Sequence, residues 1–419
     1  MTVQPVTDTT WDVKHVNVFD PQWWVDGPPH DLFKRMRAES PVHWYQFADG
    51  EGYGPGYWSL FRHADIATVS HDTETFSSNR GGLFIHPDQM LSLDVLTNML
   101  NFMDPPTHTR YRKILARVFT PAAVAKMEDG IRARVNRIID KVIEAGRCDF
   151  VEDIAVPIPL GILMELMGAP EEDMPKFYYW TEAIEQAIRD PEPNTGVEVF
   201  DEMGAYLTEQ IERQTTEAVE DSLVMRLRNA EVDGEKLTDV EIVMFFGLLT
   251  FAGNDTTRNT ASAGLRTLLE HPDALQQLYD DAALIPNAIE EILRYTSVVQ
   301  WFARTATRDV ELGGQKISEG DKVVMWYASG SRDEAVFDDS DTFDIHRPKP
   351  DHQAFGGGGR HFCLGASLAR LELRIIFEEV LGRMKNLQLA GTTEILPSNW
   401  AYGLTKLPVT FTAGRRLES

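Results

Sequence analysis

The chain has 419 residues, of which 43% are hydrophobic and 25% charged, and its formal net charge is −25. This composition is typical of a soluble globular protein, and the excess of acidic residues argues against nucleic acid and anionic membrane surfaces as partners. The two cysteines, Cys148 and Cys363, do not suggest a disulfide scaffold, so a reducing, cytoplasmic location is expected.

The N-terminal residues are polar, and we expect a flexible tail over residues 1–15. They lack the basic and apolar regions of a signal peptide, and no run of about 18 apolar residues occurs, so no membrane anchor is predicted. No linker, repeat or long charge block interrupts the rest of the sequence. Residues 16–419 are therefore expected to form one domain.

Hydrophobic periodicity along the chain predicts a mainly α protein with small peripheral β-sheets. An apolar but irregular stretch covers residues 81–102, and helical spacing dominates from His108 for nearly two hundred residues. The elements expected outside these stretches are a helix over 31–39, a strand over 57–61, a helix over 64–70, strands over 299–306, 310–312 and 323–326, and strands with turns from residue 386.

The longest predicted helix begins at a capping box, with Thr238 as N-cap and Glu241 three residues later. Its apolar pattern continues to Leu269, and the pair His271-Pro272 ends it. About thirty residues at 1.5 Å each give a length of roughly 45 Å. A helix this long and this apolar is expected to cross the middle of the fold.

A polar segment, Ala252-Gly-Asn-Asp-Thr-Thr257, interrupts this helix. Gly, Asn, Asp and Thr have low helix propensity, so their presence inside an apolar helix needs an explanation. One interpretation is that these side chains bond to preceding carbonyl groups of the helix. The other is functional: Gly253 leaves space for a flat cofactor, and Asp255 with Thr256 forms an acid–alcohol pair that can relay protons.

A glycine-rich run, Phe355-Gly-Gly-Gly-Gly-Arg-His-Phe-Cys-Leu-Gly365, precedes a predicted helix start. Taken alone, Cys363 would be a buried structural cysteine, because free cysteine usually behaves as a small hydrophobic residue. The surrounding residues favour a different interpretation. Glycines permit positive φ and close approach to a flat partner, and N–H groups at a helix start stabilise a thiolate. Cys363 is then the anionic ligand of a flat metal cofactor.

Residues 355–370 closely resemble the haem-ligand loop of the cytochrome P450 family, with a His two residues before the cysteine and a Gly two residues after it. Phe355 lies eight residues before Cys363, whereas seven is the commoner spacing in the family. The resemblance implies the cytochrome P450 fold, in which the long central helix crosses haem b (iron protoporphyrin IX). It also implies that Cys363 is the metal ligand of a bacterial haem-thiolate monooxygenase.

Further motifs of the family follow in the expected order between about residue 100 and residue 370. By this resemblance, Asp255 and Thr256 are the catalytic pair for proton delivery. A structural network of buried charges is implied for Glu291, Arg294 and Arg347. The residues implied to bind the haem or its propionates are His108, Arg112, Ala252, Gly253, Arg304, Phe355, His361, Cys363 and Gly365.

The implied activity is insertion of one atom of O2 into a C–H bond of a lipophilic substrate. The motifs are most similar to those of members acting on sterol side chains, methyl-branched lipids and terpenoids, so terminal or near-terminal hydroxylation is the narrower expectation. The residues expected to line the substrate pocket are Leu83, Phe84, Leu91, Leu93, Leu96, Trp180, Val298, Val299, Trp301, Phe302 and Leu404.

The sequence contains no flavin or iron–sulfur motif, so we expect electrons from a separate ferredoxin and ferredoxin reductase. Ferredoxins are acidic and so is this chain, so docking needs a local basic patch, with candidates Lys113, Arg117, Arg360 and Arg374. Two alternatives stay open. A haem-thiolate peroxygenase or isomerase would use the same cysteine without a proton relay, and a non-catalytic haem-binding sensor would bind ligands without turnover.

Overall fold

The computed structural model describes residues 11–48, 54–189 and 192–417. The α-helices are α1 (His30–Glu39), α2 (His63–His71), α3 (Leu93–Leu96), α4 (Thr107–Ala116), α5 (Pro121–Val124), α6 (Glu128–Val142), α7 (Pro157–Met167), α8 (Met174–Arg189), α9 (Val197–Thr216), α10 (Leu223–Asn229), α11 (Asp239–Glu270), α12 (Pro272–Asp280), α13 (Ile285–Thr296), α14 (Tyr327–Gly330) and α15 (Ala366–Arg383). The strands are β1 (Val42–Gln46), β2 (Gly56–Leu60), β3 (Phe76–Ser77), β4 (Arg147–Asp149), β5 (Glu231–Val232), β6 (Glu235–Lys236), β7 (Trp301–Ala306), β8 (Val310–Leu312), β9 (Gln315–Ile317), β10 (Lys322–Trp326), β11 (Gln388–Leu389), β12 (Glu394–Ile395), β13 (Leu404–Lys406) and β14 (Pro408–Thr410).

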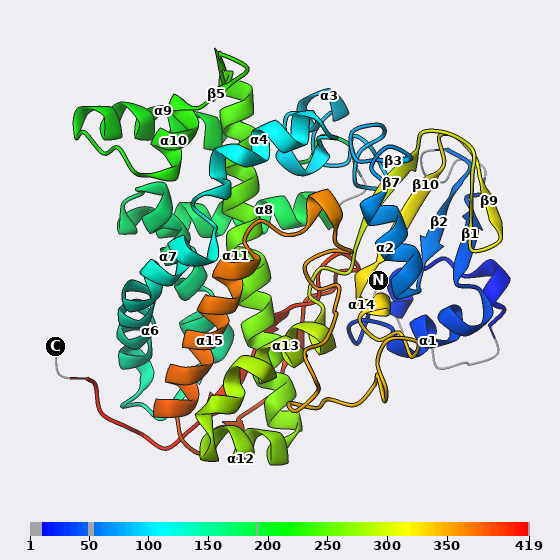
Figure 1. The fold of residues 1–419 in the computed structure, drawn as a ribbon. Coiled ribbons are helices and arrows are strands. Elements are labelled where there is room, and N and C mark those ends of the chain that lie inside the picture. Colours follow the sequence, from blue (N-terminus) through cyan, green and yellow to red (C-terminus); the bar gives the residue numbers. More distant parts are fainter. Residues whose placement is uncertain (1–10, 49–53, 190–191, 418–419) are drawn as a thin grey trace.

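The arrangement confirms the predicted mainly α fold with small peripheral sheets (Figure 1). Helix α11 runs through the middle of the helical part and contacts α7, α8, α9, α13 and α15. The largest sheet lies to one side, with strand order β1-β2-β10-β7-β3. In it β10 runs parallel to β2 and antiparallel to β7. The helical part therefore surrounds α11, and the sheet borders it.

The central helix has the ends that the sequence predicts. The Glu241 N–H donates to the Thr238 hydroxyl at 3.3 Å, and the Thr238 N–H donates to the Glu241 carboxylate at 2.7 Å, which completes the capping box. The helix spans 32 residues and stops before Pro272. The polar segment 252–257 lies inside it without breaking the helix.

The expected N-terminal tail is covered only in part, because residues 1–10 lie outside the described residues. Trp11 packs edge-on against Trp23, with ring centroids 5.3 Å apart, and the Arg35 guanidinium lies 4.1 Å above its ring. Among the described helices, none combines the length and apolar character needed to cross a membrane.

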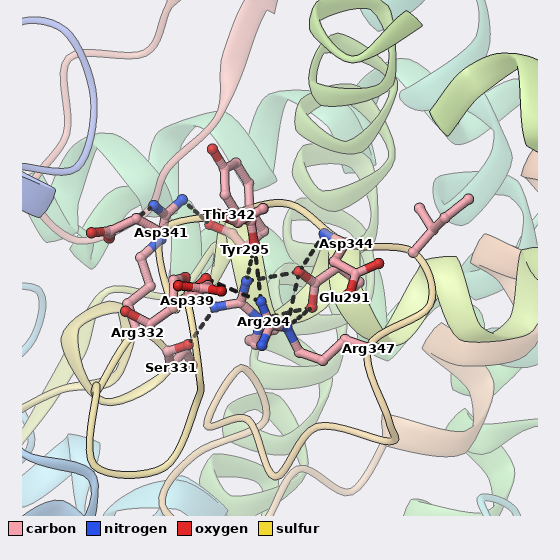
Figure 2. Close-up of polar contacts among 12 residues, drawn as sticks. Glu291, Arg294, Tyr295, Ser331, Arg332, Asp339, Asp341, Thr342, Asp344 and Arg347 are labelled. Carbon is pink, nitrogen blue, oxygen red and sulfur yellow. Dashed lines mark hydrogen bonds and ion pairs between the residues drawn. The ribbon is translucent and has the colours of Figure 1, made fainter. Parts of the chain in front are cut away.

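A buried ion network joins α13 to the loop that leads toward the glycine run (Figure 2). Glu291 and Arg294 are fully buried and pair through two hydrogen bonds of 2.7 Å, and Arg347 Nε lies 3.2 Å from the same carboxylate. Arg294 also donates to the carbonyl oxygens of Ser331 (3.1 Å) and Thr342 (3.0 Å). These bonds hold the loop over 331–347 against α13, which fixes the approach of the chain to Cys363.

Candidate functional site

The glycine run packs against α2, and this contact explains part of its composition. Gly356, Gly358 and Gly359 have φ values of 92°, 88° and 73°, a region that favours glycine. A Cβ on Gly357 would lie 2.9 Å from the Ser70 Cβ, so the run and α2 can meet only without that atom. The Ser70 hydroxyl donates to the Gly358 carbonyl at 2.8 Å. The run is therefore shaped by its protein neighbour as well as by any cofactor.

Cys363 lies at the start of α15, where main-chain donors surround its sulfur. Burial raises the pKa of Cys363, whereas N–H groups of Gly365 and Ala366 and the charges of Arg112 and Arg370 act in the opposite direction. The Cys363 N–H donates to the Phe355 carbonyl at 3.1 Å, which closes the loop. This donor set suits a metal-bound thiolate, since it stabilises negative charge on the sulfur.

The unusual spacing of Phe355 has a clear structural outcome. Its ring lies edge-on to Phe362 at 6.1 Å and beneath the Arg370 guanidinium at 4.5 Å. Arg370 is in turn held by Glu290 at 2.6 Å. Phe355 lines the same cavity as Cys363. The extra residue in the run therefore leaves Phe355 packed beside the cysteine loop.

Four basic side chains, which come from separate parts of the sequence, meet at one edge of this cavity: His108 and Arg112 on α4, Arg304 on β7, and His361. The His108 and His361 rings are 4.3 Å apart. Burial, reinforced by Arg112 and Arg304, lowers the pKa of His108 to about 4. Within the described residues, neither Arg112 nor Arg304 has a carboxylate partner within 4.0 Å, and Arg304 Nε and His108 Nδ1 have no hydrogen-bond partner.

A buried guanidinium without an anion, as at Arg304, is costly unless a ligand brings the negative charge. The two propionates of haem b would supply it at this edge, with Cys363 positioned to bind the iron. The residues of the structure therefore fit the expected cofactor. The arginines at one edge of the cavity match its propionates, and the donors around Cys363 suit a thiolate ligand.

The cavity extends from Cys363 past α11 into a chamber lined mostly by apolar side chains. Ala252, Gly253 and Thr256 of α11 line it, as predicted. Asp255 does not. From the predicted substrate pocket, the residues found on its wall are Leu83, Phe84, Val298, Val299 and Phe302.

The other predicted pocket residues lie elsewhere: Leu91, Leu93, Leu96, Trp180, Trp301 and Leu404 are not on the cavity wall. Trp301 precedes Phe302 on β7, and successive strand residues point to opposite faces, so Trp301 packs against Phe19 at 4.9 Å instead. Trp180 packs in an aromatic cluster with Phe177 and Tyr206. Leu404 belongs to a separate core cluster. Leu91, Leu93 and Leu96 come from the stretch 81–102, whose irregular apolar pattern gives no basis for choosing a face.

Several wall residues carry no recognisable signal in the sequence. Trp400 lies 5.3 Å from Phe251 and 6.0 Å from Phe302, so three distant segments form one aromatic wall. Ile184 and Ile188 of α8 also line the chamber, and their four-residue spacing could have indicated it.

Glu372 is a buried carboxyl on the wall; burial raises its pKa to about 8, and it is bonded to Thr257.

Asp255 and Thr256 have different surroundings. The Thr256 hydroxyl donates to the Ala252 carbonyl at 2.9 Å and faces the cavity. Asp255 is fully buried and accepts hydrogen bonds from Arg258 at 2.5 Å and Asn259 at 3.1 Å. Burial raises the pKa of Asp255, and Arg258 acts against this shift. Thr256 thus bonds to a preceding carbonyl group, as the first interpretation of the polar segment expects, and it also lines the cavity, whereas Asp255 does neither.

The chamber is closed on one side by a strap of two loop segments. The N–H of Asn194 donates to the Asp88 carbonyl at 3.0 Å, and the N–H of Gly196 donates to the Met90 carbonyl at 2.8 Å. The Thr195 hydroxyl donates to the Gln89 carbonyl at 3.2 Å. Met90 also lines the chamber, so this main-chain strap, formed by 88–90 and 194–196, lies at the chamber boundary.

The comparisons with known proteins agree with this geometry. The sequence profile described as Cytochrome P450 matches residues 195–412. A "Steroid C26-monooxygenase" of Mycolicibacterium smegmatis is 37% identical over 392 residues, covering 92% of this chain and 91% of the relative. A "Methyl-branched lipid omega-hydroxylase" of Mycobacterium tuberculosis is 37% identical over 400 residues, covering 93% and 92%. A solved Mycobacterium marinum cytochrome P450 in complex with pseudoionone has a TM-score of 0.86 at 34% identity, covering 97% of this chain and 100% of the other.

Proposed function

Because this chain belongs to the cytochrome P450 family, we propose that it hydroxylates a lipophilic substrate at or near a chain end, with electrons from a separate ferredoxin. The chain is a haem-dependent monooxygenase, as its relatives are. The observation that carries the proposal is the cavity that joins Cys363 and Thr256 to a chamber of apolar walls. An apolar substrate entering it would meet the cofactor at the Thr256 end.

In the proposed mechanism, haem b would supply the iron chemistry that activates O2. Cys363 would hold the iron, Arg112 and Arg304 would neutralise the propionates, and His108 and His361 would donate hydrogen bonds to them. The Thr256 hydroxyl holds a proton at the cavity face of α11, and Asp255 replaces that proton after it has been given up. The apolar walls orient the substrate and exclude water, which keeps protons on this route.

For the substrate we propose a sterol side chain, a methyl-branched lipid or a terpenoid. The names of the relatives support the first two, and the pseudoionone complex supports the third. The chamber has mostly apolar walls and few polar groups that could bind a hydrophilic ligand. The test is a binding titration of the holoenzyme with cholesterol, phytanic acid and geraniol, read by the haem spin-state change. Binding of small polar aromatic acids alone would reject this substrate class.

For the electron donor we propose docking on the face where α4 meets the turn before Cys363. Arg112 donates to the Phe362 carbonyl at 2.7 Å, which brings these segments together. Lys113, Arg117 and Arg360 are exposed there, and none of them pairs with a carboxylate of the described chain. Arg374 is less suitable, because it already pairs with Glu128 at 2.7 Å and Glu378 at 3.0 Å.

One turnover experiment separates this proposal from its alternatives. The holoenzyme is supplied with NADPH, a surrogate ferredoxin and ferredoxin reductase, and a mixture of the lipids that bind, and products are identified by mass spectrometry. Hydroxylated product that requires the electron donor supports the proposal. Product formed with peroxide but not with the donor would indicate a peroxygenase. Rearranged product without donor or peroxide would indicate an isomerase, and binding without product would indicate a sensor.

A further inference from the structure

Helices α8 and α11 meet along a polar seam inside an otherwise apolar interface. Its α8 side comes from polar residues spaced three or four apart, which share one helical face. Asn254 donates to the Thr181 hydroxyl at 3.3 Å, and Arg258 Nη1 lies 2.6 Å from the Glu182 carboxylate. The groups that face one another in the seam are Tyr178, Thr181, Glu182, Glu185 and Arg189 from α8, and Asn254, Asp255, Arg258 and Asn259 from α11.

Glu185 is a fully buried acid of this seam. Its side chain is 0% exposed, and neither carboxylate oxygen has a hydrogen-bond partner among the described residues. Its nearest cations are Arg258 Nη2 and Arg189 Nε, each at 3.9 Å. Asp255 approaches the same Arg258 Nη2 at 2.5 Å and accepts a second bond from Asn259. Two buried carboxyls thus lie near the same guanidinium nitrogen, but only Asp255 is within hydrogen-bond distance of it.

The difference in hydrogen bonding between Asp255 and Glu185 indicates which of the two acids is protonated. Asp255 has two donors that favour its ionised form, whereas Glu185 has none, so a proton shared between the two acids resides on Glu185. Consistently, burial and then the charge of Asp255 raise the pKa of Glu185 to about 8. Glu182 is 41% exposed and bonded to Arg258, so the seam reaches solvent on that side.

We propose that Glu185 is the proton reserve of the relay: after Thr256 has given up its proton, the proton of Glu185 passes to Asp255, and Asp255 passes it on to Thr256. This inference rests on the proposed function. Insertion of one oxygen atom into a C–H bond uses O2, two electrons from the ferredoxin and two protons, and the second oxygen atom leaves as water. In each transfer the O–H bond of Glu185 breaks as one on Asp255 forms, and the O–H bond of Asp255 then breaks as one on Thr256 forms. Both carboxylates are ionised at that point. Glu185 then regains its proton from solvent at the Glu182 side.

The first test needs no substrate. Infrared spectra of the holoenzyme at neutral pH are expected to contain the C=O stretch of a protonated carboxylic acid that Glu185→Gln removes. Glu182→Gln is the matched control in the same helix and should keep that band. Glu372→Gln is expected to remove a separate band, because Glu372 is another buried acid with a raised pKa. In the unchanged protein the Glu185 band should disappear as the pH rises through about 8. A spectrum unaffected by Glu185→Gln overturns the proposal.

The second test follows coupling with cholesterol or phytanic acid, whichever binds. Glu185→Gln should lower the rate of coupled product formation on the order of ten-fold and release peroxide instead, with substrate affinity unchanged. Glu185→Asp, which keeps the acid, should restore part of the coupling. Added to Asp255→Asn, Glu185→Gln should have no further effect if the two act in series.

The outcomes separate this inference from the function on which it rests. If Asp255→Asn leaves coupling intact, the proposed relay itself fails. If Asp255→Asn uncouples turnover while Glu185→Gln does not, only the role of Glu185 fails. The unfolding temperature will show whether Glu185→Gln is folded. If it is not, the pH-dependent band of the unchanged protein and the coupling of Glu185→Asp still test the role of Glu185.

Discussion

Asp255 and Thr256 are consecutive residues of α11, yet Thr256 faces the cavity while Asp255 lies against Arg258 at the α8 interface. The pair therefore spans two environments, an apolar chamber and a buried charged seam. In the proposed mechanism this position lets a proton pass from the seam to the chamber without opening the chamber to water.

Replacing Thr256 by Ala removes the hydroxyl on the chamber side. We expect a drop in coupled product formation on the order of ten-fold or more, with the consumed NADPH appearing as peroxide. Thr256→Ser, which keeps the hydroxyl, should stay close to the unchanged enzyme. Equal coupling in both variants would contradict a role for this hydroxyl.

Replacing Glu291 by Gln leaves Arg294 and Arg347 without their shared carboxylate in a buried site. We expect the free energy of unfolding to fall by about 3–5 kcal/mol, because removing one member of a buried ion network leaves the remaining charges buried without a partner. Glu319→Gln breaks an exposed pair with Arg80 and should cost less than about 1 kcal/mol. Denaturant unfolding measures both, and similar losses would show that burial of the network is unimportant.

Lys322 gives a pH-dependent contribution to stability. Its ammonium donates to the carbonyls of Gly81 and Gly82, the latter at 2.9 Å, and burial lowers its pKa to about 7. Between pH 7 and about 10.4 the unfolded chain then binds more protons than the folded one. The free energy of unfolding should rise with pH in this window, by at most about 1.4 kcal/mol per unit. Lys322→Met should lose this slope; an identical pH profile in both proteins would refute it.

Trp400→Ala opens the aromatic wall formed with Phe251 and Phe302. Weaker binding of the lipid that fits the unchanged chamber, and tighter binding of bulkier sterols, are expected in spin-state titrations. Unfolding free energy should fall by about 3–5 kcal/mol. Trp58→Ala removes a buried Trp that lies outside the chamber, so it should lose stability without changing ligand preference. The same change in preference in both variants would argue against a wall role.

Arg117→Glu reverses one charge on the proposed docking face. Reduction of the haem by ferredoxin, followed by stopped flow, should slow at low salt and approach the unchanged rate as salt is raised. Substrate titrations should be unaffected. Lys316→Glu, on the exposed β8–β9 hairpin, is the control for net charge. Reduction that slows equally in the control would assign the effect to overall charge.

Much of this fold can be predicted because its signals are local. The capping box at Thr238, the Pro after His271 and the alternation near β8 and β10 set element ends within a residue or two. The charged and glycine-rich motifs likewise indicated which residues would meet around Cys363.

The chamber was harder to predict because it is formed by contacts between distant segments. Neither the meeting of Trp400 with Phe251 nor that of Glu185 with Arg258 follows from spacing within one segment. Trp301 was assigned to the chamber on hydrophobicity alone, but strand alternation directs Phe302 there. Asp255 bonds to Arg258 of its own helix, but the acids of α8 that face Arg258 are brought there only by the tertiary structure.

The strap between 88–90 and 194–196 depends mainly on main-chain atoms. Its closure is therefore largely independent of which side chains these residues carry, whereas the walls behind it are made of side chains. Wall residues outside the strap can therefore be changed without removing these main-chain bonds. Within the strap, Gly196 is the exception, because a Cβ there would lie 2.9 Å from the Met90 carbonyl oxygen, so any larger residue would push the strap apart.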